Sequence, residues 1–167
     1  MKIYLNELLS LQGEPLAINQ ELVNDLLGFE HQTLRRINSC LAQGLVLYDA
    51  SAQRASVQLH LTGSMILPHS VTNEEVSIPF DTETFDVFSF VDGDTDEDVV
   101  EVKTDFIDLS PYVFSAVVSE IPLRIVTDEP YLYPSGQGWK VMSEQEYDAK
   151  EKPLDPRLAK LKEFKFD

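Results

Sequence analysis

The chain has 167 residues, of which 43% are hydrophobic and 25% are charged, a composition typical of globular proteins. A chain of this length buries about two thirds of its unfolded surface, which excludes a small scaffold that needs disulfides or a structural metal to fold. Its formal net charge of −16 excludes a protein that neutralises nucleic-acid phosphates over its whole surface. We therefore expect one domain over residues 1–167.

The single cysteine, Cys40, excludes an internal disulfide and every zinc motif built on cysteine pairs. Its mixed sequence surroundings are typical of a small buried hydrophobe rather than a nucleophile. One cysteine also fits a reducing compartment, so we expect a cytoplasmic protein. The N-terminus has a glutamate where a signal peptide would be apolar, and no stretch approaches 18 apolar residues, so secretion and membrane spanning are not expected.

The first 30 residues predict a strand, a turn and a helix. Loose alternation of apolar and polar residues predicts a strand over 1–11, and the Gly-Glu-Pro sequence at 13–15 predicts a turn. Residues 18–27 place apolar side chains at helical spacing, with Asn19 as a possible N-cap and Gly28 as a C-terminal stop. We expect a short amphipathic helix there.

The middle of the chain predicts neighbouring antiparallel strands. Apolar and polar residues alternate over 57–61, and Gly63 interrupts the alternation as a bulge or bend would. Alternation returns over 76–80, and residues 85–91 are rich in aromatic and β-branched side chains. The connections between these three segments are too short for parallel crossovers, so we expect antiparallel pairing.

The acidic residues concentrate in one third of the chain. Between Asn73 and Asp108 there are thirteen acidic residues and one lysine, a local charge of −12. The densest part is residues 92–98, here called the acidic loop, which we expect to form a solvated loop or hairpin tip because its carboxylates cannot all be buried. A strand is expected to restart over 99–102. The carboxylates that could bind a basic partner are Asp92, Asp94, Asp96, Glu97 and Asp98.

The acidic loop resembles a calcium-binding loop only at its start. The alternate aspartates match the start of an EF-hand loop. However, Glu97 stands where a glycine is required for the sharp turn, and Lys103 stands where a bidentate glutamate is required. We therefore expect no metal there.

Two helices are predicted in the second half by the same pair of signals. Ser110 and Pro111 form an N-cap followed by proline at the first helical position, which predicts a short, largely buried helix. Asp155 and Pro156 repeat these signals ahead of a basic amphipathic helix that closes the chain. Strands with a few peripheral helices favour a single α+β domain on an antiparallel, open or partly closed sheet.

The terminal helix over 155–167 is a candidate binding element. Its apolar residues can pack on the domain while its basic residues contact RNA phosphates or an acidic partner, and its terminal position would let it detach. The alternative is a docked surface helix whose basic residues serve only as solvated charges. The candidate binding residues are Arg157, Lys160, Lys162 and Lys165.

The sequence contains no recognisable catalytic motif. Its histidines, His31, His60 and His69, do not stand at metal-ligand or nucleophile–base spacings, and we expect His69 to be exposed or hydrogen-bonded in a turn. Nucleophile-elbow, dinucleotide-binding, phosphate-loop and zinc-protease signatures are absent. A hydrolase would have to rely on unpatterned carboxylates such as Asp81 and Glu83. We therefore expect a protein without catalytic residues, cofactor or small-molecule substrate.

Three sequence blocks resemble the YceD family of large ribosomal RNA accumulation proteins, in its Gram-positive form. The first is LTGSMILP at 61–68 followed by VSIPF at 76–80, and the second is DLSPY at 108–112 running to IPL at 121–123. The third joins the Gly-Trp pair at 138–139 to the closing DPRLAKL at 155–161, which is the most specific block.

The resemblance implies a non-enzymatic factor in ribosome biogenesis. Such a factor is needed for normal accumulation of large-subunit ribosomal RNA and is often encoded beside a small large-subunit ribosomal protein. Many members carry a Cys-x-x-Cys pair just after the Leu-Pro of the first block, where this chain has His69 and Thr72. One imidazole and one hydroxyl are a poor zinc pair, which puts a metal or redox role of these positions in doubt.

The net charge leaves two hypotheses for how such a factor acts, because a protein at −16 is repelled by naked RNA. In the first, the basic terminal helix contacts precursor large-subunit ribosomal RNA. In the second, which has the larger electrostatic contribution, the acidic surface of residues 74–108 holds a basic ribosomal or assembly protein. The alternative from another class is an acidic regulator or DNA mimic unrelated to ribosomes.

Overall fold

The computed structural model describes residues 1–94, 96–125, 135–142 and 146–147. Contacts divide the chain into two units, Met1–Asp128 and Glu129–Asp167. In the second unit, the described residues include two short antiparallel strands, β8 (Ser135–Gly136) and β9 (Trp139–Lys140). The predicted terminal helix over 155–167, with its four candidate basic residues, lies outside the described residues.

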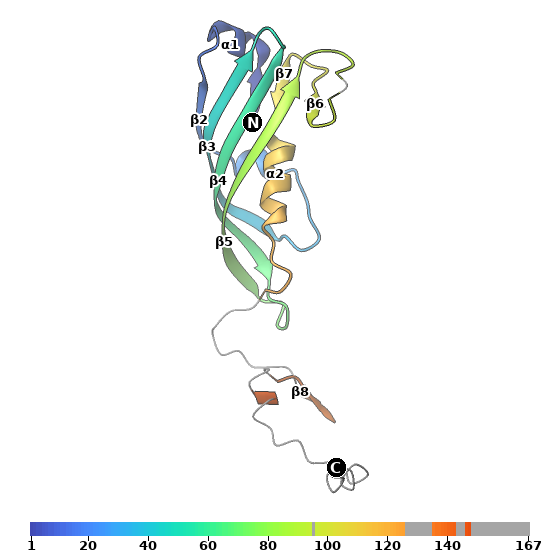
Figure 1. Cartoon of the computed structure of the whole chain (residues 1–167). Coiled ribbons are helices and arrows are strands. Elements are labelled where there is room, and N and C mark those ends of the chain that lie inside the picture. The colour runs from blue at the N-terminus through green and yellow to red at the C-terminus, as the bar shows by residue number, and fades with distance from the viewer. Residues whose placement is uncertain (95, 126–134, 143–145, 148–167) are drawn as a thin grey trace, which may run out of the picture. The chain divides into compact units, whose positions relative to one another are not determined.

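The first unit has the predicted α+β architecture (Figure 1). Strands β2 to β6 form an open five-stranded sheet in chain order, antiparallel except for the parallel pair β5–β6, and β1 pairs with β7 antiparallel. The described elements are β1 (Lys2–Tyr4), α1 (Leu5–Ser10), β2 (Leu16–Glu21), the 3-10 helix η1 (Asn24–Leu26), β3 (Arg36–Asp49), β4 (Arg54–Pro68), β5 (Glu75–Ser89), β6 (Val99–Glu101), β7 (Phe106–Asp108) and α2 (Ser110–Ser119).

The two faces of the sheet follow from the alternation of side chains along the strands. On β5, the Phe88 ring packs edge-on against Tyr112 of α2 at 5.0 Å between centroids, so Phe88 and its cross-strand partners define the inner face. Helix α2 adds Val113 and Val117 to this core. The buried inner-face residues of the three long strands are Cys40, Ala42, Val46, Tyr48, Ala55, Val57, Leu59, Leu61, Met65, Leu67, Phe80 and Phe88.

Gly63 allows strands β3, β4 and β5 to approach closely. A Cβ atom at this position would lie 2.0 Å from the carbonyl oxygen of Ser39 and 2.7 Å from the Phe80 ring. Phe80 is its cross-strand partner and covers the position that lacks a side chain. The bulge alternative predicted at Gly63 is wrong, because β4 is paired continuously there and the irregularity lies in β3, between Ile37 and Ser39.

The N-terminal predictions are corrected by the structure. The predicted strand over 1–11 is only β1, because helix α1 takes over at Leu5. The predicted helix over 18–27 is instead β2 followed by η1. Of its apolar residues, Ile18, Leu22 and Leu26 are buried, whereas Leu27 is exposed. Ile18 belongs to a strand, and the pairing of β2 with β3 satisfies backbone groups that a helix would have satisfied internally.

Candidate partner-binding site

The acidic loop connects β5 to β6. These two strands are parallel, with Val87 opposite Val99 and Ser89 opposite Glu101. The loop is therefore a short crossover along the sheet edge, and the hairpin-tip alternative is wrong. The strand predicted over 99–102 is confirmed as β6.

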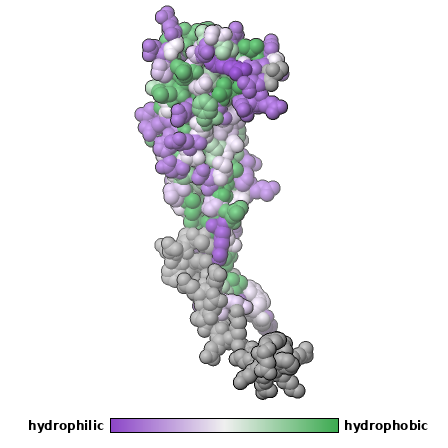
Figure 2. Space-filling model, viewed as in Figure 1, coloured by the Kyte–Doolittle hydropathy of each residue, from purple (hydrophilic) through white to green (hydrophobic). Residues whose placement is uncertain are grey.

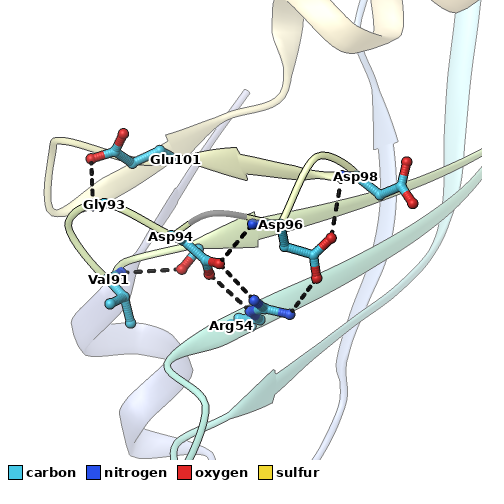
Figure 3. Close-up of polar contacts among 8 residues, drawn as sticks. Arg54, Val91, Gly93, Asp94, Asp96, Asp98 and Glu101 are labelled. Atoms are coloured by element: carbon cyan, nitrogen blue, oxygen red, sulfur yellow. Dashed lines mark hydrogen bonds and ion pairs between the residues drawn. The ribbon is translucent and has the colours of Figure 1, made fainter.

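Arg54, the first residue of β4, holds one part of the acidic loop (Figure 3). Its guanidinium binds Asp94 through two hydrogen bonds, Nη2 to Oδ1 at 2.7 Å and Nε to Oδ2 at 3.0 Å. A third bond runs from Nη1 to Oδ2 of Asp96 at 3.1 Å. The Asp94 side chain is only 12% exposed, so its carboxylate is compensated by a planar bidentate partner.

These contacts make the Asp94 carboxyl a stronger acid than usual. The Arg54 guanidinium, and next the Ser89 hydroxyl, hold the pKa of Asp94 below its ordinary value by hydrogen bonding to the ionised form. The stabilising contribution of this pair is present above the unfolded carboxyl pKa of about 3.9 and is lost as the pH falls through the lower folded pKa. The loop is thus anchored at neutral pH.

The remaining carboxylates of the acidic loop face solvent. Asp92, Glu97 and Asp98 are exposed. The loop backbone is ordered by its own carboxylates, since the Asp96 and Asp98 amides donate to Asp94 and Asp96 at 3.3 and 3.4 Å. Gly93, at a φ of +73°, donates its amide to Glu101 at 3.3 Å. The five predicted partner-binding carboxylates therefore divide into two bound by Arg54 and three that are presented outward.

The contacts of Arg54 with Asp94 and Asp96 were not predicted from the sequence. Arg54 and Asp94 are forty residues apart, and neither shows a local pattern that links them. The available signal was charge alone, since Arg54 precedes the alternation predicted over 57–61 and the strongly negative segment that follows it.

His69 and Thr72, where the resemblance implies a cysteine pair, meet at the turn after β4. His69 is 4% exposed, and its Nδ1 accepts the backbone amides of Val71 and Thr72 at 3.3 and 3.2 Å. The expected hydrogen-bonded histidine is confirmed, and the imidazole here stabilises the turn. Within the described ranges, no three His, Cys, Asp or Glu side chains gather so that they could hold a metal ion.

Cys40 is a buried core residue, and His60 is paired with a carboxylate on the sheet surface. Cys40 is fully buried, and burial, followed by the charge of Glu21, raises the pKa of its thiol to about 11, which keeps it protonated and unreactive at neutral pH. The predicted buried cysteine is confirmed. His60 contacts Asp81 at 2.6 Å between Nε2 and Oδ1, with Asp81 largely exposed, and Glu83 is exposed on the same face.

Comparison with known proteins places these features in a family. Residues 57–165 match the family model described as large ribosomal RNA subunit accumulation protein YceD. The chain is 34% identical over 137 residues to the uncharacterized protein YlbN of Bacillus subtilis (strain 168), covering 78% of this chain and 77% of the relative. No solved structure matches, and none of the described helices is long and apolar enough to cross a membrane. This chain belongs to the YceD family.

Proposed function

We propose that this protein is a non-enzymatic, cytoplasmic factor that supports the accumulation of large-subunit ribosomal RNA by holding a basic ribosomal or assembly protein. Family membership supports the ribosome-related role. The observation that carries the mechanism is the divided acidic loop: Arg54 fixes Asp94 and Asp96, so the exposed carboxylates Asp92, Glu97 and Asp98 stand on an ordered loop. An ordered array of like charges loses little conformational freedom when it binds an oppositely charged partner.

The acidic surface suits a basic protein better than RNA. The −12 segment between Asn73 and Asp108 attracts lysine-rich and arginine-rich chains and repels phosphates. A ribosomal protein held in this way would be screened from nonspecific RNA until its delivery. Direct contact with precursor ribosomal RNA belongs, in this proposal, to Arg157, Lys160, Lys162 and Lys165 of the basic C-terminal segment.

The test is affinity capture of the tagged chain from growing cells, with bound proteins and RNA quantified before and after RNase treatment. We expect basic ribosomal or assembly proteins to remain after RNase. Large-subunit precursor RNA that is lost with RNase, without any retained ribosomal protein, would assign binding to RNA alone. Recovery of DNA-binding proteins and no ribosomal component would support the rival acidic regulator or DNA mimic.

A charge-matched pair of variants tests the loop itself. We expect Asp92→Asn/Glu97→Gln/Asp98→Asn to weaken retention of the basic protein about tenfold at low salt, with a smaller effect at high salt because exposed charges are screened. The control is Glu14→Gln/Glu30→Gln/Glu120→Gln, which removes the same charge from exposed positions outside the loop. Equal weakening by both variants would show a net-charge effect and would contradict a loop-specific contact.

A further inference from the structure

The face of the sheet opposite α2, here called the open face, has an ordered surface of its own. It is formed by side chains of β2 to β5 that alternate with the buried core residues. Each row across the strands is fixed by register: Leu45 lies opposite Gln58, and Gln58 lies opposite Phe85. On one side of this row, Leu47, Ser56 and Val87 form the neighbouring row. On the other side, Gln43, His60 and Glu83 form the neighbouring row.

Large apolar side chains on this face are exposed to solvent. Leu45 is 50% exposed, Leu47 is 51% exposed and Phe85 is 67% exposed. Leu45 and Phe85 share one row with Gln58 between them, a separation of about 10 Å at ordinary strand spacing. In the view of Figure 2, hydrophobic and hydrophilic residues are interspersed over the coloured surface. Exposed apolar side chains gathered on one face mark an interaction surface.

A hollow of about 250 Å³ lies beside this apolar row. It is lined by the outward side chains of Leu45, Gln58, His60 and Glu83, and by Gly44 and neighbouring residues. Gly44, opposite the inward-facing Leu59, lets β3 approach β4 closely beside this hollow, since a Cβ atom there would lie 2.0 Å from the carbonyl oxygen of Gln58. The hollow therefore has an apolar wall and a carboxylate at its rim.

Carboxylates border the apolar row on one side. Glu83 stands in the adjacent row, and Glu21 and Asp81 stand in the row beyond it, across β2 to β5. All three are exposed. The central rows of the face carry no lysine or arginine among the described residues, since Arg36 and Arg54 lie at the sheet ends in ion pairs with Glu75 and Asp94. His60, the remaining basic side chain there, is paired with Asp81.

We propose that the open face docks a basic protein segment that also carries apolar side chains. An apolar side chain of the segment enters the hollow beside Leu45 and Phe85, and its lysine or arginine residues pair with Glu83 and Asp81. Charge complementarity selects this partner, because the same carboxylates repel RNA phosphates. The inference rests on the proposed function and identifies a second surface, apart from the acidic loop, for the same basic partner.

The identity of the occupant can be tested by photocrosslinking in the full chain. Phe85 is replaced by benzoylphenylalanine, and the protein is irradiated with RNase-treated total protein extracted from purified large ribosomal subunits. We expect crosslinks to lysine-rich or arginine-rich segments of ribosomal proteins, absent when the same group replaces Leu27, which is 75% exposed away from the open face. Crosslinks to residues 155–167 of the same chain, to a second copy, or to nothing would overturn the proposal.

Paired variants then separate this proposal from the proposed function. Glu83→Gln/Phe85→Ser should weaken affinity for the crosslinked ribosomal protein about tenfold, whereas Glu120→Gln/Leu27→Ser should leave it unchanged. All four positions are exposed, so neither variant opens the core. If the unaltered chain binds none of the ribosomal proteins, the proposed function fails. If it binds them and the Glu83/Phe85 variant binds equally well, only the docking face is wrong.

Discussion

The inner and open faces of the five-stranded sheet use the same strands for different purposes. The inner face carries the apolar core, in which Leu61 is fully buried. The open face, one residue along in each strand, mixes exposed Leu45 and Phe85 with the carboxylates Asp81 and Glu83. Because side chains alternate with a period of two, one sequence specifies a core and a surface independently.

This separation implies that stability and binding are decided by different residues. Substitutions on the inner face remove packed atoms that the surrounding structure cannot replace. Substitutions on the open face remove side chains that water already reaches on one side. Substitutions on the two faces should therefore differ in their effect on the free energy of unfolding.

The largest difference should appear between two leucines on neighbouring strands. Leu61→Ala removes a fully buried side chain and should lower the free energy of unfolding by about 3 kcal/mol. Leu45→Ala removes a half-exposed one and should change it by less than about 1 kcal/mol. Chemical denaturation of both variants measures the difference. Similar losses would mean that the open face is covered in the folded chain.

A smaller effect is expected from adding one methyl group. Gly63→Ala forces a Cβ atom against the backbone oxygen of Ser39 and the ring of Phe80, and should cost about 2 kcal/mol. Gly28→Ala is the matched control, since nothing lies within 4 Å of a Cβ atom at that position. Thermal unfolding of the two variants should show a lowered Tm only for position 63. An unchanged Tm there would argue against close approach of β3 and β4.

The smallest effect concerns a carboxyl on the inner face. Asp86 lies two residues before Phe88 on β5 and therefore on the same face of the sheet. Burial raises the pKa of Asp86. Burial, followed by the charge of Asp86, raises the pKa of Tyr112. A raised folded pKa means that ionisation costs stability above it, so Asp86→Asn should stabilise the protein at pH 7 by less than about 1 kcal/mol after solvent screening.

The stability gained by Asp86→Asn should depend on pH. The gain from Asp86→Asn should disappear as the pH falls below the unfolded carboxyl pKa of about 3.9, where both states are protonated. Urea unfolding at pH 7 and at pH 3.5 measures it, with the exposed Asp92→Asn as the control. A variant less stable than the original chain at pH 7 would contradict a partly buried, destabilising carboxylate at Asp86.

The strands could be predicted from sequence where alternation was intact. Residues 57–61 alternate cleanly and lie in β4 as predicted. Strand β5 was predicted as two segments because its inner positions 82, 84 and 86 are polar while the outward Phe85 is apolar, which interrupts the expected pattern. The helix predicted over 18–27 failed because Ile18 and Leu22 are four residues apart, a spacing that a strand followed by a turn produces as well as a helix does.

The candidate site was predicted in part. The acidic loop was evident from composition, which shows where carboxylates accumulate along the chain. Which of them remain exposed depends on Arg54, a partner forty residues from Asp94 that only the folded sheet brings near. The open face was missed for a similar reason, because the rows that place Leu45 near Phe85 and Glu83 near His60 depend on register, which strand alternation alone leaves undetermined.

The pairing of β1 with β7 implies an order of folding events, in which the central sheet forms first. Strands β3, β4 and β5 follow one another in sequence and pair through short connections, so their contacts close small loops. Lys2 pairs with Asp108, a contact that closes a loop over most of the first unit. Its entropic cost is lowered once the intervening sheet is compact. During synthesis the N-terminal strand must therefore wait for a partner that leaves the ribosome long after it does.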